Sequence, residues 1–310
     1  MRWSIAYGAG GGRRAAGVDG MLRGILRTLR PHQWMKNSFV LAPLVFSRHL
    51  GERDVTLRAI GATLVFCLLS GSVYAINDVL DAEKDRAHPT KRNRPVASGC
   101  VPPRLASAVA VGLIAVSIGA APLLGVGFSI VASAYLLQNL AYSLVLKEVV
   151  FVDVLSIAAG FVLRVLGGSL AAGVEPSVWL LVCTFLLALF LALGKRSHEL
   201  RTAGDRAGER RPVLRRYSAG AIRTLMLATG VATMCAYAAY TLAPHTREFF
   251  GTWMLVLTTP FPAFGLLRFV GFVGRRNGGE SPTDSMLRDV PFLANLALYA
   301  AAVLAILYAT

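Results

Sequence analysis

Hydrophobic and polar residues alternate along this chain in long blocks, with apolar segments separated by short charged connections. Several segments run for about 20 residues without a charge, which is long enough for a helix to cross a hydrocarbon core of roughly 30 Å. Gly and Pro mark most of the connections. The pattern predicts an all-α polytopic transmembrane bundle of about nine helices, expected at 35–48, 59–80, 104–123, 126–146, 150–172, 177–195, 220–243, 252–271 and 290–309.

The composition supports a membrane protein. Of the 310 residues, 55% are hydrophobic and 16% are charged, and a soluble domain of this length has too little interior to bury so much apolar surface. We therefore expect residues 25–310 to form a single transmembrane catalytic domain. Residues 1–24 are predicted to be a disordered N-terminal tail, since the first 20 contain no apolar stretch of the kind that a cleaved signal needs.

The formal net charge of +15 raises the question of nucleic acid as a partner. The basic residues lie in loops between apolar segments instead of forming one soluble patch, which argues against nucleic acid. Loops 81–104 and 195–216 are rich in Lys and Arg, whereas connections 123–126 and 173–177 have none; loop 48–58 is an exception. The positive-inside rule then predicts a multi-pass protein of the inner (plasma) membrane, with a cytoplasmic N-terminus and an external C-terminus.

The clearest chemical signal is the segment Asn77-Asp78-Val-Leu-Asp81-Ala-Glu-Lys-Asp85 at the predicted cytoplasmic end of the second helix. At about 100° per residue, its Asn and three Asp residues fall on one helix face. Carboxylates one turn apart repel each other, so their grouping calls for a cation. Mg²⁺ prefers such hard oxygen ligands, together with substrate phosphate oxygens. We predict Mg²⁺ binding by Asn77, Asp78, Asp81 and Asp85, with the three Asp as catalytic residues; the alternative is an ordinary solvated helix end.

A basic stretch, 86–95, follows directly. Its Lys and Arg side chains could neutralise phosphate oxygens that the metal does not reach. Lys91 and Arg94 are therefore predicted to bind substrate at the same cytoplasmic site. By itself the stretch could equally be a set of charges that only fixes the orientation in the membrane.

Polar residues inside or at the ends of predicted helices are further candidates for substrate binding. Asp153 and Arg164 are 11 residues apart, within about 20° of the same helix face, and an Arg so deep in a span generally faces a cavity or a partner. Tyr142, Lys147 and Lys36 lie near predicted helix ends. For all five residues a structural role stays open, as a buried contact or as an interfacial anchor.

The segment 77–85 matches the NDxxDxxxD motif of the UbiA-type intramembrane prenyltransferase superfamily, and the basic Asn-Arg-Pro that follows also resembles that family. The resemblance extends over essentially the whole chain after residue 25. It implies a helix bundle around a central cavity, dependence on Mg²⁺ and a substrate that carries a diphosphate.

One departure from the family pattern is informative. Aromatic prenyltransferases of the superfamily carry a second Asp-rich motif at the end of the sixth helix, where this chain reads Leu193-Gly-Lys195-Arg196-Ser-His-Glu199-Leu200. A Lys-Arg pair has replaced two acids, with Glu199 one turn away. The change in charge indicates a site that binds more phosphate than one prenyl diphosphate brings, and Lys195, Arg196 and Glu199 join the predicted substrate-binding residues.

Further segments resemble the decaprenyl-phosphate phosphoribosyltransferase branch of the superfamily; they are 30–37, 142–147 and 160–168 together with the GKRxxEL at 194–200. That resemblance implies a Mg²⁺-dependent membrane glycosyltransferase with two substrates, 5-phosphoribosyl 1-diphosphate and decaprenyl phosphate. The products would be diphosphate and decaprenylphosphoryl-5-phosphoribose, a precursor for arabinan of the cell wall (arabinogalactan and lipoarabinomannan).

Two other functions stay open at this point. An aromatic or quinone prenyltransferase of the UbiA type would move an isoprenoid instead of a sugar phosphate, and the Lys195-Arg196 pair argues against it. A transporter for an anionic solute would place polar residues along a path through both leaflets, whereas the charge here gathers at one side. The oligomeric state is also open, with a homo-oligomer among the alternatives.

Overall fold

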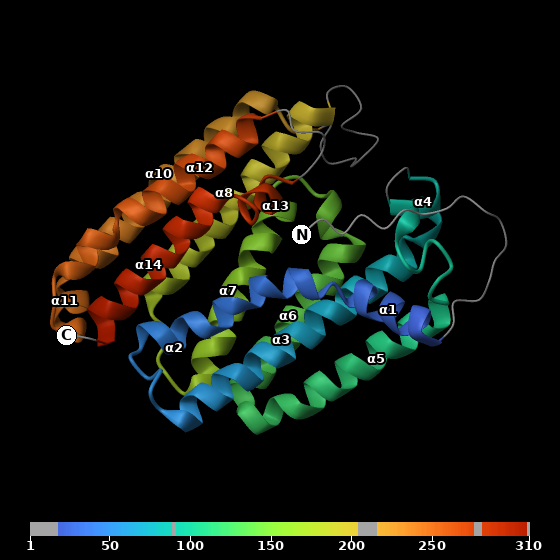
Figure 1. The fold of residues 1–310 in the computed structure, drawn as a ribbon, viewed down its shortest axis with the longest axis horizontal. Coiled ribbons are helices and arrows are strands. Elements are labelled where there is room, and N and C mark those ends of the chain that lie inside the picture. Colours follow the sequence, from blue (N-terminus) through green and yellow to red (C-terminus); the bar gives the residue numbers. More distant parts are fainter. Residues whose placement is uncertain (1–17, 89–90, 204–215, 276–280, 309–310) are drawn as a thin grey trace.

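The computed structural model describes residues 18–88, 91–203, 216–275 and 281–308, and the regular structure in these ranges is helical. The elements in chain order are α1 (Val18–Leu29), η1 (Pro31–Leu41), α2 (Ala42–Phe46), α3 (Arg53–Leu80), α4 (Ala82–Arg86), η2 (Lys91–Asn93), α5 (Pro103–Ala120), η3 (Ala121–Leu124), α6 (Val126–Leu144), η4 (Leu146–Glu148), α7 (Val152–Ala172), α8 (Val178–Ala203), α10 (Ala219–Leu242), α11 (Pro244–Phe250), η7 (Met254–Thr258), α12 (Pro260–Gly274), α13 (Pro282–Met286) and α14 (Val290–Tyr308). Figure 1 shows the long helices lying side by side as a bundle. The all-α prediction is confirmed.

Among the described residues, seven helical segments are long and apolar enough to cross a membrane: α3, α5 with η3, α7, α8, α10, η7 with α12, and α14. Helix α6 has 19 residues and runs beside α7, but Gln138 and Asn139 make it more polar. Every one of the nine predicted ranges overlaps a helical segment. The protein is thus a multi-pass membrane protein.

The first predicted helix, 35–48, differs from the expectation. In its place a 3₁₀ helix, Pro31–Leu41, is followed by the short α-helix Ala42–Phe46. Pro43 lies in the first turn of that α-helix, where its missing N–H costs nothing. Because a 3₁₀ helix rises about 2.0 Å per residue and an α-helix about 1.5 Å, these 16 residues still cover roughly 30 Å.

Residues 18–24, which we expected in the disordered tail, form the beginning of α1, while residues 1–17 lie outside the described ranges. The helix is amphipathic: Ile25 and Leu29 pack against residues of α3 and α5, whereas Leu22 and Leu26 are more than half exposed. Burial of its inner face against the bundle is the reason that the helix begins earlier than the composition suggested.

The two largest apolar clusters of the bundle both include residues of α7. One joins η1, α3, α6 and α7 around Phe66, Phe128 and Tyr135. The other joins the start of α7 to α8, α10, α12 and α13 around Phe190 and Phe269. As a result, the ends of α3, α6 and α8 meet the starts of α7 and α10 at one end of the bundle. The predicted site residues near these helix ends are thereby brought to the same end.

The contact between η1 and α7 depends on a glycine. A Cβ atom added at Gly168 would collide with the backbone carbonyl oxygen of Val40. Since backbone cannot move aside as a flexible side chain can, the close approach requires glycine at this position. Gly168 therefore sets how closely the irregular first span packs on α7.

We expect Gly168→Ala to lower the thermal unfolding temperature of the purified protein, because displacing Val40 should cost about 1–3 kcal/mol. Gly112→Ala on α5 is the matched control. A Cβ there meets no atom within 4 Å, so the substitution should be neutral or stabilising by up to about 1 kcal/mol. Equal unfolding temperatures for the two variants would contradict this role of Gly168.

Candidate functional site

Residues 77–85, which we call the acidic segment, lie where α3 ends. Helix α3 stops at Leu80 and α4 begins at Ala82, with Asp81 between them. The helical hydrogen bonds continue across this break: the Asp81 N–H donates to the Asn77 carbonyl at 2.9 Å, and the Asp85 N–H donates to the Asp81 carbonyl at 2.8 Å. Asp78 and Asp85 are buried, whereas Asn77 and Asp81 are partly exposed. The helix break therefore leaves the three carboxylates on consecutive turns.

Three cations from separate segments converge on these carboxylates. Arg30 Nη2 donates to Asp78 Oδ1 at 2.6 Å, and Arg94 Nη1 lies 2.7 Å from Asp85 Oδ2 and 3.3 Å from Asp78 Oδ1. Lys147 Nζ is 4.0 Å from Asp81 Oδ1. The predicted Arg94 and Lys147 thus meet the acidic segment, while Lys91 lies exposed on the adjacent η2.

Arg30 was not among the site residues predicted from the sequence. The backbone of Arg30, directly before Pro31, is in the left-handed region, with φ 52° and ψ 61°. Such a conformation costs on the order of 1–3 kcal/mol outside glycine. The guanidinium also lies 5.0 Å from the centre of the Tyr74 ring, so its orientation is fixed from two sides. Arg30 is the first residue of the segment 30–37 that resembles the phosphoribosyltransferase branch, and that was the available signal.

The donor atoms present are of the kind that Mg²⁺ prefers. Within the described ranges no three His, Cys, Asp or Glu side chains gather as a preformed metal cage. Mg²⁺ does not need one, since it is typically held by one or two carboxylates and completed by phosphate oxygens and water. Arg30 and Arg94 both contact Oδ1 of Asp78, and the Asp81 carboxylate is about one-third exposed. Mg²⁺ binding at Asn77, Asp78, Asp81 and Asp85 fits this chemistry and stays a prediction.

A second polar network joins the start of α7 to the end of α8. Arg196, 1% exposed, donates from Nε to Asp153 Oδ2 at 2.6 Å and from Nη1 to Glu199 Oε2 at 2.8 Å. Its Nη2 also donates to the Tyr142 hydroxyl at 3.4 Å. Four predicted site residues from α6, α7 and α8 therefore form one network, which we call the Arg196 network.

Tyr217, which sequence reasoning missed, completes the Arg196 network. Its hydroxyl donates to Asp153 Oδ1 at 2.5 Å and accepts from the Phe151 N–H at 2.8 Å. Burial, reinforced by the hydrogen bond to Asp153, raises the pKa of Tyr217 above its usual value. The phenol therefore stays protonated and continues to donate to the carboxylate. Tyr217 follows the Arg-rich loop directly, and no spacing in the sequence links it to Asp153.

The connection between α6 and α7 links the Arg196 network to the acidic segment. Tyr142 near the end of α6 contacts Arg196, and Lys147 on η4 approaches Asp81. Lys195, next to Arg196 on α8, is partly buried and lies at the same end of the bundle. Acidic and basic site residues thus share one end of the molecule, as the sequence analysis required.

Arg164 lies in a third network, in the middle of α7. Its Nε donates to Asn37 Oδ1 at 2.7 Å, Nη1 to the Gly160 carbonyl at 3.0 Å, and Nη2 to the Tyr135 hydroxyl at 2.7 Å. Asp153 and Arg164 were predicted to share one face of this helix, but they belong to different networks, because Asp153 contacts α8 and Arg164 contacts η1 and α6. Lys36 precedes Asn37 on η1 and is partly buried.

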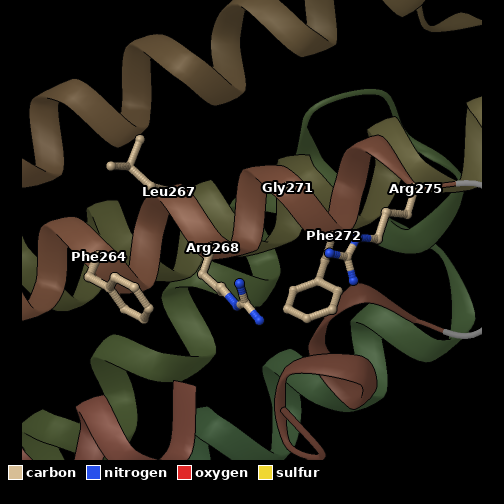
Figure 2. A pocket seen from close by; sticks show the side chains of 6 residues that line it. All are labelled: Phe264, Leu267, Arg268, Gly271, Phe272 and Arg275. Atoms are coloured by element: carbon tan, nitrogen blue, oxygen red, sulfur yellow. The ribbon is translucent and has the colours of Figure 1, made fainter. Parts of the chain in front are cut away.

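A pocket of about 360 Å³ lies along one face of α12, lined by Phe264, Leu267, Arg268, Gly271, Phe272 and Arg275 (Figure 2). Arg268 donates two hydrogen bonds to Asp289, at 2.9 and 2.7 Å, and so ties α12 to the start of α14. Leu267 is 73% exposed, as expected for a side chain that faces lipid. None of the predicted site residues lines this pocket, so we do not place the reaction there.

Comparison with known proteins identifies relatives over most of the chain. The model of the UbiA prenyltransferase family matches residues 40–308. The chain is 35% identical over 273 residues to decaprenyl-phosphate phosphoribosyltransferase of Corynebacterium glutamicum, covering 86% of this chain and 81% of that protein. The proteins of the same name from Mycobacterium tuberculosis H37Rv and Mycolicibacterium smegmatis are 33% and 32% identical, over 87% and 91% of this chain and 89% and 93% of those proteins.

Solved structures agree on the fold. A UbiA homolog from Archaeoglobus fulgidus bound to GPP and Mg²⁺ superimposes with a TM-score of 0.69 and 20% identity, covering 92% of this chain and 99% of that one. The complex of that homolog with DMAPP and Mg²⁺ gives a TM-score of 0.70 at 19% identity, over 93% and 100% of the two chains. With the match to the family model and the relatives above 30% identity, these findings show that the chain belongs to the UbiA prenyltransferase family.

Proposed function

We propose that this protein transfers 5-phosphoribose from 5-phosphoribosyl 1-diphosphate to decaprenyl phosphate, which makes it a phosphoribosyltransferase of the UbiA family. The observation that carries the proposal is that the three carboxylates of the acidic segment share one end of the bundle with Arg30, Arg94, Lys147, Lys195 and the Arg196 network. A diphosphate donor and a second phosphorylated substrate require this combination of charges. The relatives named decaprenyl-phosphate phosphoribosyltransferase, which align with 86–91% of this chain, support the same reaction.

The residues of the chain have distinct tasks in this reaction. Asp78, Asp81 and Asp85, with Asn77, would hold Mg²⁺ beside the diphosphate of the donor. When bound there, the metal neutralises the diphosphate and improves it as a leaving group. Arg30 and Arg94 fix the buried carboxylates in position. This support matters because small displacements of reacting groups are costly to catalysis.

The acceptor needs no general base, because a lipid phosphate is already anionic at neutral pH. Its oxygen attacks ribose C1 from the side opposite the leaving diphosphate. We assign the binding of phosphate oxygens to Lys147 and Lys195, which lie at the same end of the bundle as the acidic segment. Arg196 is already bound to Asp153, Glu199 and Tyr142, so its task is to hold the ends of α7 and α8 together beside the reacting groups.

The location of the site agrees with a cytoplasmic reaction. The acidic segment, the Arg196 network and the described residues of the Lys/Arg-rich loops 81–104 and 195–216 lie at the same end of the bundle. By the positive-inside rule this end faces the cytosol of the inner membrane, where a soluble phosphoribosyl donor would be supplied. The lipid substrate reaches the site from the bilayer, which accounts for a sugar-phosphate transferase being built inside a membrane.

Asp81→Asn should lower kcat by a factor on the order of 10²–10³, the usual loss when an electrostatic contact to developing charge is removed. The variant should still fold, because the Asp81 side chain is partly exposed and isosteric with Asn. Glu83→Gln is the control, since Glu83 is exposed on the same short helix α4. Product formation in purified membranes measures both, and wild-type turnover by Asp81→Asn would remove its catalytic role.

Removal of divalent metal should stop turnover. We expect excess EDTA to reduce the rate to background and added Mg²⁺ to restore it, because a diphosphate without a bound cation is a poor leaving group. The measurement is the initial rate over a titration of free Mg²⁺. Undiminished activity in EDTA would contradict the assignment of the acidic segment.

The choice of substrate separates this proposal from the aromatic prenyltransferase alternative. Membranes that contain the protein should convert radiolabelled 5-phosphoribosyl 1-diphosphate and decaprenyl phosphate to a labelled lipid. They should not prenylate an aromatic acceptor with a prenyl diphosphate. The reverse outcome would establish the alternative, and inactive Asp81→Asn membranes serve as the blank for both assays.

A further inference from the structure

Arg164 is a buried cation whose partners are neutral. It lies near the middle of α7 and is 7% exposed. Its three hydrogen bonds go to an amide oxygen, a backbone carbonyl and a phenol, and its guanidinium also lies over the rings of Tyr135 and Phe161, at 4.8 and 5.0 Å. In the part of the chain that the structure describes, no carboxylate pairs with Arg164.

A buried charge without a counter-ion is costly, even with hydrogen bonds and aromatic neighbours. Charged residues inside membrane spans generally serve a substrate, an ion or a partner. At the neighbouring acidic segment the arginines are matched, because Arg30 and Arg94 pair with Asp78 and Asp85. The other buried arginine, Arg196, is paired with Asp153, so Arg164 lacks the compensation that these three arginines have.

Lys36 adds a second positive charge to this region. It lies on η1 next to Asn37, which binds Arg164, and interacts electrostatically with both Arg164 and Arg30. Asp284 of α13 is the acid that acts on Lys36. The charge of Arg30 is matched by Asp78. Lys36 and Arg164 are therefore left with one carboxylate, Asp284, and the region has an excess of positive charge for an anion.

The position along α3 relates this region to the acidic segment. Asn37 donates to Ser70 Oγ at 3.2 Å, and Ser70 precedes Asp78 by eight residues on the same helix. At about 1.5 Å per residue the two levels are roughly 12 Å apart. Tyr74 lies between them in sequence, with Arg30 over its ring. If the diphosphate of a substrate binds at the acidic segment, the part of that substrate farthest from the diphosphate would therefore extend toward Arg164.

We propose that Arg164 and Lys36 form a second anion subsite. It binds a phosphate monoester of a substrate, and it lies deeper in the bundle than the site of the diphosphate. The assignment rests on the proposed function and adds to it a determinant of specificity. A prenyl diphosphate would place uncharged hydrocarbon here, whereas both substrates of the proposed reaction have a phosphate monoester: the 5-phosphate of the donor and the phosphate of the lipid acceptor. A phosphate monoester carries a charge of about −1.5 to −2 at pH 7 and accepts several hydrogen bonds.

The test is a binding experiment without turnover. Purified full-length protein in detergent with EDTA is titrated with ribose 5-phosphate, with ribose as its uncharged counterpart, and with farnesyl phosphate, with farnesol as its counterpart. Calorimetry and ligand-induced shifts in unfolding temperature give the affinity. We expect one phosphorylated ligand to bind measurably more tightly than its counterpart; ribose 5-phosphate would identify the donor as the source and farnesyl phosphate the acceptor.

Variants connect that affinity to the two residues. Arg164→Gln and Lys36→Gln should each raise the Kd of the bound phosphate at least tenfold, and Arg164→Lys should retain part of the affinity. Arg58→Gln is the matched control: Arg58 binds backbone carbonyls of Ala171 and Leu124 at the opposite end of the bundle, and its loss should leave the Kd unchanged. If Arg164→Gln does not fold, the partly exposed Lys36 decides the result alone.

The subsite is overturned if wild-type protein does not distinguish either phosphate from its counterpart, or if the Lys36→Gln variant has the wild-type Kd for both ligands. These failures are separable from failure of the proposed function. A protein that binds the phosphate as expected but forms no phosphoribosyl lipid refutes only the reaction. A protein that forms the lipid with unchanged KM values in both variants refutes only the subsite.

Discussion

This structure depends on one constraint: charged side chains inside a bundle surrounded by lipid must be compensated by opposite charges. Isolated charges are expensive to bury, so each buried acid near the helix ends is matched by a cation from another segment. Asp78 is bound by Arg30 and Arg94, and Asp153 by Arg196. These pairs join segments that are far apart in the chain, and they fix the geometry of the end where the chemistry is proposed.

The irregular first span has a function in this arrangement. As a 3₁₀ helix in close contact with Gly168 of α7, η1 presents Lys36 and Asn37 toward the bundle and begins directly after Arg30. A regular α-helix would turn by a different angle per residue and distribute these side chains differently. Backbone strain at Arg30 and the close approach at Gly168 are thus the local costs of placing three polar residues beside α3 and α7.

Balanced and unbalanced charges have separate roles in the proposed reaction. The Arg196 network is internally satisfied and positions the ends of α7 and α8. The acidic segment has cations that support it but also oxygen atoms that suit Mg²⁺. Arg164 and Lys36 have more positive than negative charge around them, and we assign this excess to a substrate phosphate. An enzyme that uses a prenyl diphosphate would then differ at Arg164 and Lys36, where it would bind hydrocarbon instead of a phosphate.

The all-α class, the long apolar spans and the acidic motif could be read from the sequence, because they depend on local periodicity and on residues close together in the chain. The 3₁₀ form of the first span, the role of Arg30 and the addition of Tyr217 could not. Asp153 and Arg164 share a helix face, yet they belong to different networks, since a neighbour contributed by another helix decides which partner each meets. Contacts between residues tens of positions apart depend on how helices pack, and only the tertiary structure determines that.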